Sequence, residues 1–256
     1  MPNTRRYGAS IAVLLGTLFI LLTDSHVTAQ TLENRRLLIG FSGGTQFVKD
    51  AVRNEVNFKL FQEMGKFTAN YDITTDTAFD ASIAVRLYKR IGVGVDVSHF
   101  NKLTTAAIEA EVPHPFFFYF PRMTSGTASG ITRRELALHT QVQYWPVIAN
   151  KFLVRGFFGP TIFDVSHDLV SEIITSERGF DFSEVNIVDH RTIKSDKFAL
   201  GFNIGIDMSY FMHDHIGLAL VVRYSRGTSD VKIDGQDQPV LELGGTHLAG
   251  GLRIAF

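Results

Sequence analysis

Histidines that could do chemistry lie next to a serine in two places and close to a second histidine in a third. Ser98-His99 and Ser166-His167 each put a nucleophilic hydroxyl beside a general base, and the His-Asp-His stretch at 213–215 spaces two imidazoles as metal ligands. Adjacent residues of an extended strand point to opposite faces, so neither Ser-His pair forms a dyad if its segment is a strand. Two histidines in a tight turn are more often polar turn residues. The sequence therefore predicts no catalytic residue, no metal site and no cofactor.

Charged residues form a second set of candidate functional residues, because they recur on one side of the alternating segments described below. An unpaired buried charge costs several kcal/mol, so a balanced set of acids and arginines indicates mutual neutralisation. Arginine suits this role because its planar fork can bridge two carboxylates. The predicted network contains Asp80, Asp96, Glu135, Asp207, Arg86, Arg155, Arg223 and Arg253, with Gln141, Gln143, Asn203 and His247 available to satisfy the remaining polar groups.

The elements that must position these charges are β-strands. In the stretch 198–211, large apolar residues at every second position alternate with small or polar ones, which is the period of a strand with two different faces. The same alternation recurs along the chain. It predicts eight strands, over about 37–47, 79–88, 91–98, 135–144, 152–162, 198–211, 216–225 and 240–256.

The connections between these strands alternate in length. Short turns are expected at 89–90, 146–150 and 212–215, and long polar connections at about 48–77, 101–131, 166–196 and 227–239. Short periplasmic turns and longer extracellular loops are typical of an outer-membrane barrel. A soluble β-sandwich also alternates, but its exposed face should be rich in Lys, Glu and Thr, whereas the second face here is mostly Gly, Ala and Ser.

The N-terminus predicts export. Arg5 and Arg6 precede the apolar run at 11–22, and small residues before Gln30 suit a cleavage site near Ala29. We therefore expect a signal peptide at 1–29 and one barrel domain at 30–256. The chain has no cysteine, so no disulfide supports it, and its net charge of −1 gives no basis for nucleic-acid binding. After residue 22 no apolar run is long enough to span a bilayer as a helix, so spanning would require strands.

With its eight alternating strands and a last strand that ends in Phe256, the chain resembles the small OmpA/OmpX-like outer-membrane β-barrel family of Gram-negative bacteria. The resemblance covers essentially the whole mature chain and implies an all-β fold, an eight-stranded antiparallel transmembrane barrel. It also implies a location in the outer membrane, contact with its lipid and lipopolysaccharide, and a C-terminal signal for the barrel-assembly machinery. The residues that match this signal are Leu252, Ile254 and Phe256.

The interior of an eight-stranded barrel is just wide enough for side chains to fill it. We therefore expect a plugged lumen and a structural or surface-interaction role carried by the loops, in a monomer. Two alternatives are a narrow channel for ions or small solutes and a lipid A-modifying enzyme, although the His-x-Ser-Asn pattern of lipid A deacylases is absent.

Two long connections bear on partners. One holds the aromatic run Phe116, Phe117, Phe118, Tyr119 and Phe120, which is either part of the aromatic girdle at the membrane surface or an exposed patch for a surface ligand. The acidic connection at 166–196 is either a solvated loop or a divalent-cation contact to lipopolysaccharide phosphates. The first connection contains Phe58, Leu60, Phe61 and Phe67, which leaves an extra hairpin, and thus ten strands, open.

Overall fold

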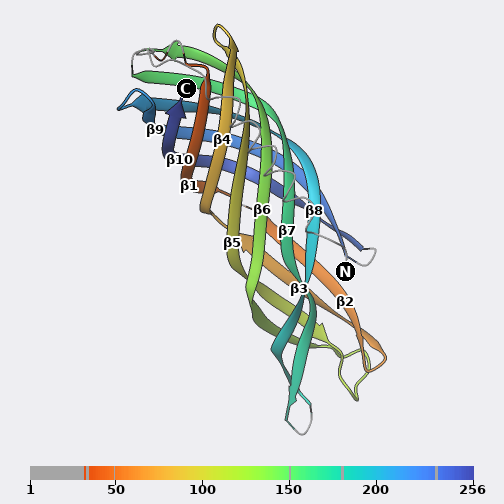
Figure 1. Cartoon of the computed structure of the whole chain (residues 1–256). Coiled ribbons are helices and arrows are strands. Elements are labelled where there is room, and N and C mark those ends of the chain that lie inside the picture. Colours follow the sequence, from red (N-terminus) through yellow and green to blue (C-terminus); the bar gives the residue numbers. More distant parts are fainter. Residues whose placement is uncertain (1–31, 33–34, 49, 150, 180–181, 234–235) are drawn as a thin grey trace, which may run out of the picture.

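The structure of this chain is a computed structural model, and it describes residue 32 and residues 35–48, 50–149, 151–179, 182–233 and 236–256. The predicted signal peptide at 1–29 lies outside these residues. The described residues form ten antiparallel strands (Figure 1). Their bounds are β1 Leu37–Phe47, β2 Asp50–Leu60, β3 Glu63–Ile73, β4 Asp76–Tyr88, β5 Ile91–Val112, β6 Arg122–Ile148, β7 Phe152–Arg178, β8 Glu184–Phe211, β9 Ile216–Ile233 and β10 Gln236–Ala255.

Eight of the strands close into a ring. The order is β1, β4, β5, β6, β7, β8, β9, β10 and back to β1, with every neighbouring pair antiparallel. The first and last strands close the ring over ten residue pairs, from Leu38 opposite Ala255 to Phe47 opposite Thr246. The predicted eight-stranded antiparallel barrel is confirmed.

The two further strands, β2 and β3, form a hairpin inserted between β1 and β4. β3 pairs with the outer part of β5, where Lys66–Tyr71 lie opposite Ala106–Glu111, and so lies outside the ring. The chain thus has ten strands and an eight-stranded barrel, which answers the question that the sequence left open. The hairpin adds to the wall beyond the end of β4.

The long connections consist largely of strand. β5 continues outward to Val112 and β6 returns from Arg122. In the same way β7 continues outward to Arg178 and β8 returns from Glu184. Together with β2 and β3 they form an extension of the barrel, which in Figure 1 runs to the end of the molecule opposite the C-terminus. We call this part the extracellular extension, because it lies on the side of the long connections.

The chemistry of the two faces inverts where the extension begins. On the barrel part of β5, Val93, Val95 and Val97 are exposed while Asp96 and Ser98 are buried. Further along the same strand Ala106, Ile108, Ala110 and Val112 are buried, and Glu109 and Glu111 point outward. A greasy outside suits lipid and a polar outside suits water. The inversion therefore marks the level at which the strands leave the bilayer on the extracellular side. Strand β7 reaches this level just after Ile162.

Buried apolar side chains gather in two clusters at opposite ends of the molecule. The larger one fills the extension and contains Phe67, Tyr71, Phe100, Phe163 and Leu169 among others. The smaller one lies at the periplasmic end, where Leu32, Leu38, Trp145, Leu153 and Phe211 pack together. The polar interior of the membrane-spanning part lies between them. Among the described residues, no helix is long and apolar enough to cross a membrane.

Candidate functional site

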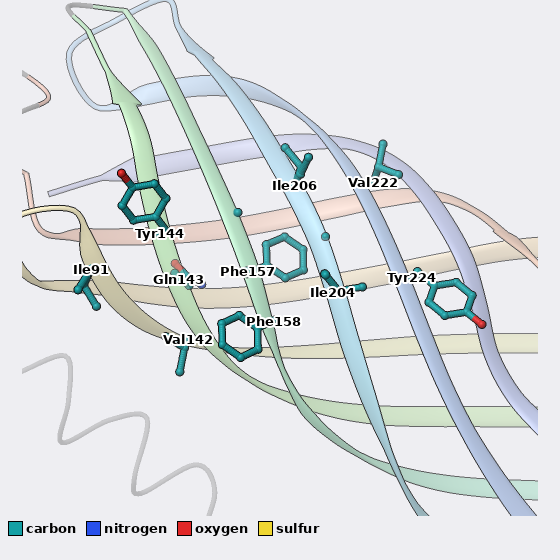
Figure 2. Close-up of a pocket in the computed structure, with 12 residues that line it drawn as sticks. Ile91, Val142, Gln143, Tyr144, Phe157, Phe158, Ile204, Ile206, Val222 and Tyr224 are labelled. Atoms are coloured by element: carbon teal, nitrogen blue, oxygen red, sulfur yellow. The ribbon is translucent and has the colours of Figure 1, made fainter.

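The outer surface of the ring is a belt of exposed apolar side chains. Figure 2 shows the part formed by β5 to β9, where Tyr144, Phe158, Ile204 and Tyr224 stand on the outside of the wall. A shallow hollow of about 700 Å³ lies here, over Gly156, whose missing side chain leaves open space. Because its rim and floor are almost wholly apolar, the hollow belongs to the lipid-facing surface.

The polar interior is organised around buried ion pairs, of which Arg223 makes the first group. Its Nη1 lies 2.7 Å from Asp96 Oδ1 and its Nη2 lies 2.6 Å from Asp80 Oδ1. The same Nη2 lies 3.1 Å from Nδ1 of His247. One guanidinium therefore bridges β4, β5 and β10 from β9, as the fork geometry of arginine allows.

Asp207 is the centre of the second group. Its Oδ2 lies 2.7 Å from Nη2 of Arg155 and 2.8 Å from Nη2 of Arg253, while Ser209 Oγ donates a hydrogen bond of 2.6 Å to Oδ1. All four side chains are buried. A single carboxylate on β8 thus links β7 to β10 across the lumen.

Glu135 sits at the outer limit of the polar interior. Gly244 N donates to its Oε1 at 3.0 Å, and Arg133 Nη2 lies 3.5 Å from its Oε2. Arg133, fully buried, was absent from the predicted set, although it precedes Glu135 by two residues and so shares its face. The structure places Arg86 at the periplasmic end instead, with its guanidinium carbon 5.7 Å from the ring centroid of Trp145.

Neutral polar residues fill the space between the ion pairs. Ser98 Oγ lies 2.9 Å from His139 Nε2, and His139 Nδ1 lies 2.8 Å from Thr161 Oγ1, to which Asn203 donates at 3.0 Å. Ser98 thus meets a histidine from a neighbouring strand rather than His99. All four residues are buried between the two apolar clusters.

The remaining histidines of interest have structural contacts. His215 Nδ1 lies 2.8 Å from the carbonyl oxygen of Ala255, and its ring centroid lies 6.0 Å from that of Phe256. His167 packs edge-on to Tyr71, with centroids 5.2 Å apart, inside the extension. Burial there lowers the pKa of His167 to about 4. No group of three metal-ligating side chains occurs in the described part of the chain.

A side-chain seam joins the two halves of the extension. β6 and β7 pair only as far as Arg133 and His167, so beyond this point the four-stranded sheet of β2, β3, β5 and β6 faces the β7–β8 hairpin. Val170 N donates to Tyr71 Oη at 2.7 Å, and Asn54 donates to Val170 O at 3.0 Å. Burial raises the pKa of Tyr71, which keeps its hydroxyl neutral.

The acidic segment at 166–196 is mostly strand, and several of its acids have partners. Glu177 pairs with Arg122, Glu172 lies 3.0 Å from Arg191, and Asp168 accepts a hydrogen bond of 3.1 Å from Thr132 N. These contacts tie β7 to β6 and β8. The lipopolysaccharide-bound cation stays a prediction.

The aromatic run lies at the far end of the extension, in the turn between β5 and β6. Phe116 to Phe120 are 58–90% exposed, and Tyr119 is the most exposed of the five. The part of β5 at 102–112 separates them from the membrane belt by ~35 Å of strand. They therefore lie beyond the level of an interfacial girdle. We call these five residues the aromatic tip.

Hydrogen bonds from neighbouring side chains hold the aromatic tip in shape. His114 Nδ1 accepts from the backbone amides of Phe116 and Phe117, each at 3.1 Å. Glu63, the first residue of β3, accepts from Tyr119 N at 2.9 Å. Arg122 donates to the carbonyl oxygens of Pro113 at 2.8 Å and Phe182 at 2.7 Å. Three hairpin ends are thereby joined into one structure.

The predicted C-terminal signal occupies the periplasmic end of the closing strand. Phe256 N donates to Leu37 O at 2.8 Å, and Phe256 O accepts from Arg36 N at the same distance. Leu252 and Phe256 are about half exposed on the outer face, with Ile254 less so. The last residue therefore helps to close the ring as well as facing outward.

No protein-family model and no curated sequence matches the chain. Solved structures with a similar fold include the outer membrane protein OprG from Pseudomonas aeruginosa, at 11% identity and a TM-score of 0.45, covering 89% of this chain and 99% of that one. The outer membrane protease OmpT from Escherichia coli has 10% identity and a TM-score of 0.45, covering 91% and 100%. The Yersinia pestis protein Ail, in complex with the heparin analogue sucrose octasulfate, has 10% identity and a TM-score of 0.36, covering 85% and 99%.

The fold and interior together define the class of protein. A closed ring with an even number of antiparallel strands, short turns at one end, an apolar outer belt and a polar interior satisfies every backbone group within a bilayer. The chain is a small outer-membrane β-barrel.

Proposed function

We propose that this barrel is a non-conducting anchor that holds the extracellular extension rigidly at the cell surface for interaction with a partner there. The observation that carries the proposal is the aromatic tip. Five exposed aromatic residues, fixed by hydrogen bonds at the end of a packed extension, form an apolar surface that folding alone does not require. The eight-stranded ring and aromatic C-terminus support an OmpA/OmpX-like barrel that the assembly machinery inserts.

The interior supports an anchor rather than a channel. Buried side chains occupy it in three layers, namely the periplasmic cluster around Trp145, the ion pairs around Arg223 and Asp207, and the large apolar cluster of the extension. An ion would have to pass both apolar clusters. The buried Ser98–His139 contact supports a structural use of these side chains rather than a catalytic one.

The experiment compares adhesion of bacteria that display the wild-type protein or a variant with serine at all five positions of the aromatic tip. Adhesion to octyl-coated glass beads should be strong for the wild type and lost for the variant, while both proteins keep heat-modifiable migration on gels. A matched control, Val188→Ser with Ile193→Ser, removes two exposed apolar residues from the side of the extension. Equal adhesion of wild type and five-serine variant would overturn the proposal.

A further inference from the structure

The aromatic tip has the features required to enter a lipid bilayer. We propose that it docks into the interface of an apposed membrane, with zwitterionic phospholipid as its partner. The inference rests on the proposed surface role and names the partner of that same site. Three properties of the tip carry it, namely its shape, its backbone hydrogen bonds and the position of nearby charges.

The first property is shape. The tip is a turn that protrudes at the end of a hairpin, with side chains exposed in succession from Phe116 to Phe120. Met64, at the end of the β2–β3 hairpin, is also exposed and lines one hollow together with Phe118 and Tyr119. A folded partner would have to supply a matching deep groove, whereas a bilayer interface accepts aromatic rings without a fixed shape.

The second property is the backbone. A polar backbone group that enters an apolar phase unbonded is costly. In the aromatic tip the amides of Phe116, Phe117 and Tyr119 already donate to His114 Nδ1 and to Glu63. A loop that only met water would not need these bonds, because water would accept from the same amides. The turn can therefore leave water without losing hydrogen bonds at these three positions.

The third property is charge. The sequence from Pro115 to Pro121 contains no ionisable group except the Tyr119 hydroxyl, which is suited to an interface, and the charged group bonded to the tip is the carboxylate of Glu63. The nearest arginine, Arg122, points back into the extension, where Glu177 and two carbonyl oxygens hold it. No cationic cluster lies on the tip to select anionic lipid, so insertion depends on aromatic burial and favours neutral headgroups.

The distance between the barrel and the aromatic tip determines which membrane the tip can reach. The ~35 Å of strand between the belt and the aromatic tip carries the tip away from the barrel's own bilayer. The extension is packed and joined by the Tyr71–Val170 and Arg122–Glu177 contacts, so it does not fold back. The tip therefore points away from the barrel's own bilayer and can reach only a membrane that is apposed to the cell surface.

The experiment uses a single fluorophore, which the absence of native cysteine makes straightforward. The full barrel in a nanodisc carries Tyr119→Cys labelled with an environment-sensitive dye, and phosphatidylcholine vesicles are added. We expect a several-fold rise in emission with a blue shift, and quenching by nitroxide-labelled lipid in the vesicles. A Val188→Cys control on the side of β8 should not respond. An unchanged Tyr119 signal would overturn the inference.

The vesicle affinity of a variant gives a second readout. Phe117→Ser in the labelled protein should raise the vesicle concentration for half-maximal binding about ten-fold, since burying one phenylalanine contributes a free energy equivalent to about that factor. Vesicles with anionic lipid should bind no more tightly, and a strong preference for them would contradict the charge argument. If octyl-coated beads are bound and phosphatidylcholine vesicles are not, this inference fails while the proposed surface role stands. If neither is bound, both fail.

Discussion

The buried carboxylate of Asp207 should be the most sensitive single position in the barrel interior. Its side chain is 1% exposed and lies within 2.8 Å of guanidinium nitrogens of both Arg155 and Arg253. Asp207→Asn keeps the shape but removes the charge, which leaves two buried arginines facing a neutral amide. Breaking one buried pair typically costs about 3–5 kcal/mol, and two arginines share this carboxylate. We expect a loss of about 4 kcal/mol in the free energy of unfolding.

The assay is urea unfolding of the barrel in lipid vesicles, followed by the fluorescence of the single tryptophan, Trp145, and by heat-modifiable migration. A matched control is Asp196→Asn on the same strand, whose pair with Lys194 is exposed and spans 3.8 Å. An exposed pair contributes only about 0–1 kcal/mol. The control should therefore unfold at nearly the wild-type urea concentration.

A compensating change separates charge from packing. Adding Arg253→Gln to Asp207→Asn removes one of the two unmatched positive charges, so part of the lost stability should return. Two results would refute the reasoning. One is a loss of less than about 1 kcal/mol in the free energy of unfolding for Asp207→Asn. The other is that Arg253→Gln lowers the stability of the Asp207→Asn variant by as much as it lowers that of the wild type.

Three more predictions concern the extension and the lumen. Tyr71→Phe leaves the amide of Val170 without its acceptor and should lower stability by about 1–3 kcal/mol in the same assay. Because His167 has a folded pKa of about 4, below its unfolded value, stability should fall as the pH drops from ~6.5 to ~4, by up to about 3 kcal/mol, and His167→Phe should flatten that dependence. In planar-bilayer recording the pure protein should give no stable open level, and a large steady conductance would disprove the closed interior.

The sequence by itself determined the strands of the membrane-spanning part. Phe198, Leu200 and Phe202 alternate with small residues, and this two-residue period admits only an extended segment with one lipid-facing side. Parity also assigned Asp80, Asp96, Asp207 and Arg223 to the interior, because every second side chain shares a face. These features are local, so they can be read along one strand at a time.

The strands of the extension could not be predicted in this way, because there the apolar side chains at alternate positions face the interior instead of lipid. Ala106, Ile108 and Ala110 alternate with Thr105, Ala107, Glu109 and Glu111, a pattern that suits a water-exposed strand but shows no apolar outer face. Only the pairing of β3 with β5, and the packing of this sheet on β7 and β8, make them a core. The sequence thus predicted connections where the structure has strands.

Partners across the lumen were decided by tertiary structure alone. That Arg223 bridges Asp80 and Asp96, that Glu135 accepts from Gly244 N, and that Ser98 meets His139 all depend on the register between strands far apart in the chain. A strand's period fixes which way a side chain points, whereas closure of the ring fixes what it meets. Direction is a local property of the backbone, and contact is a property of the whole sheet.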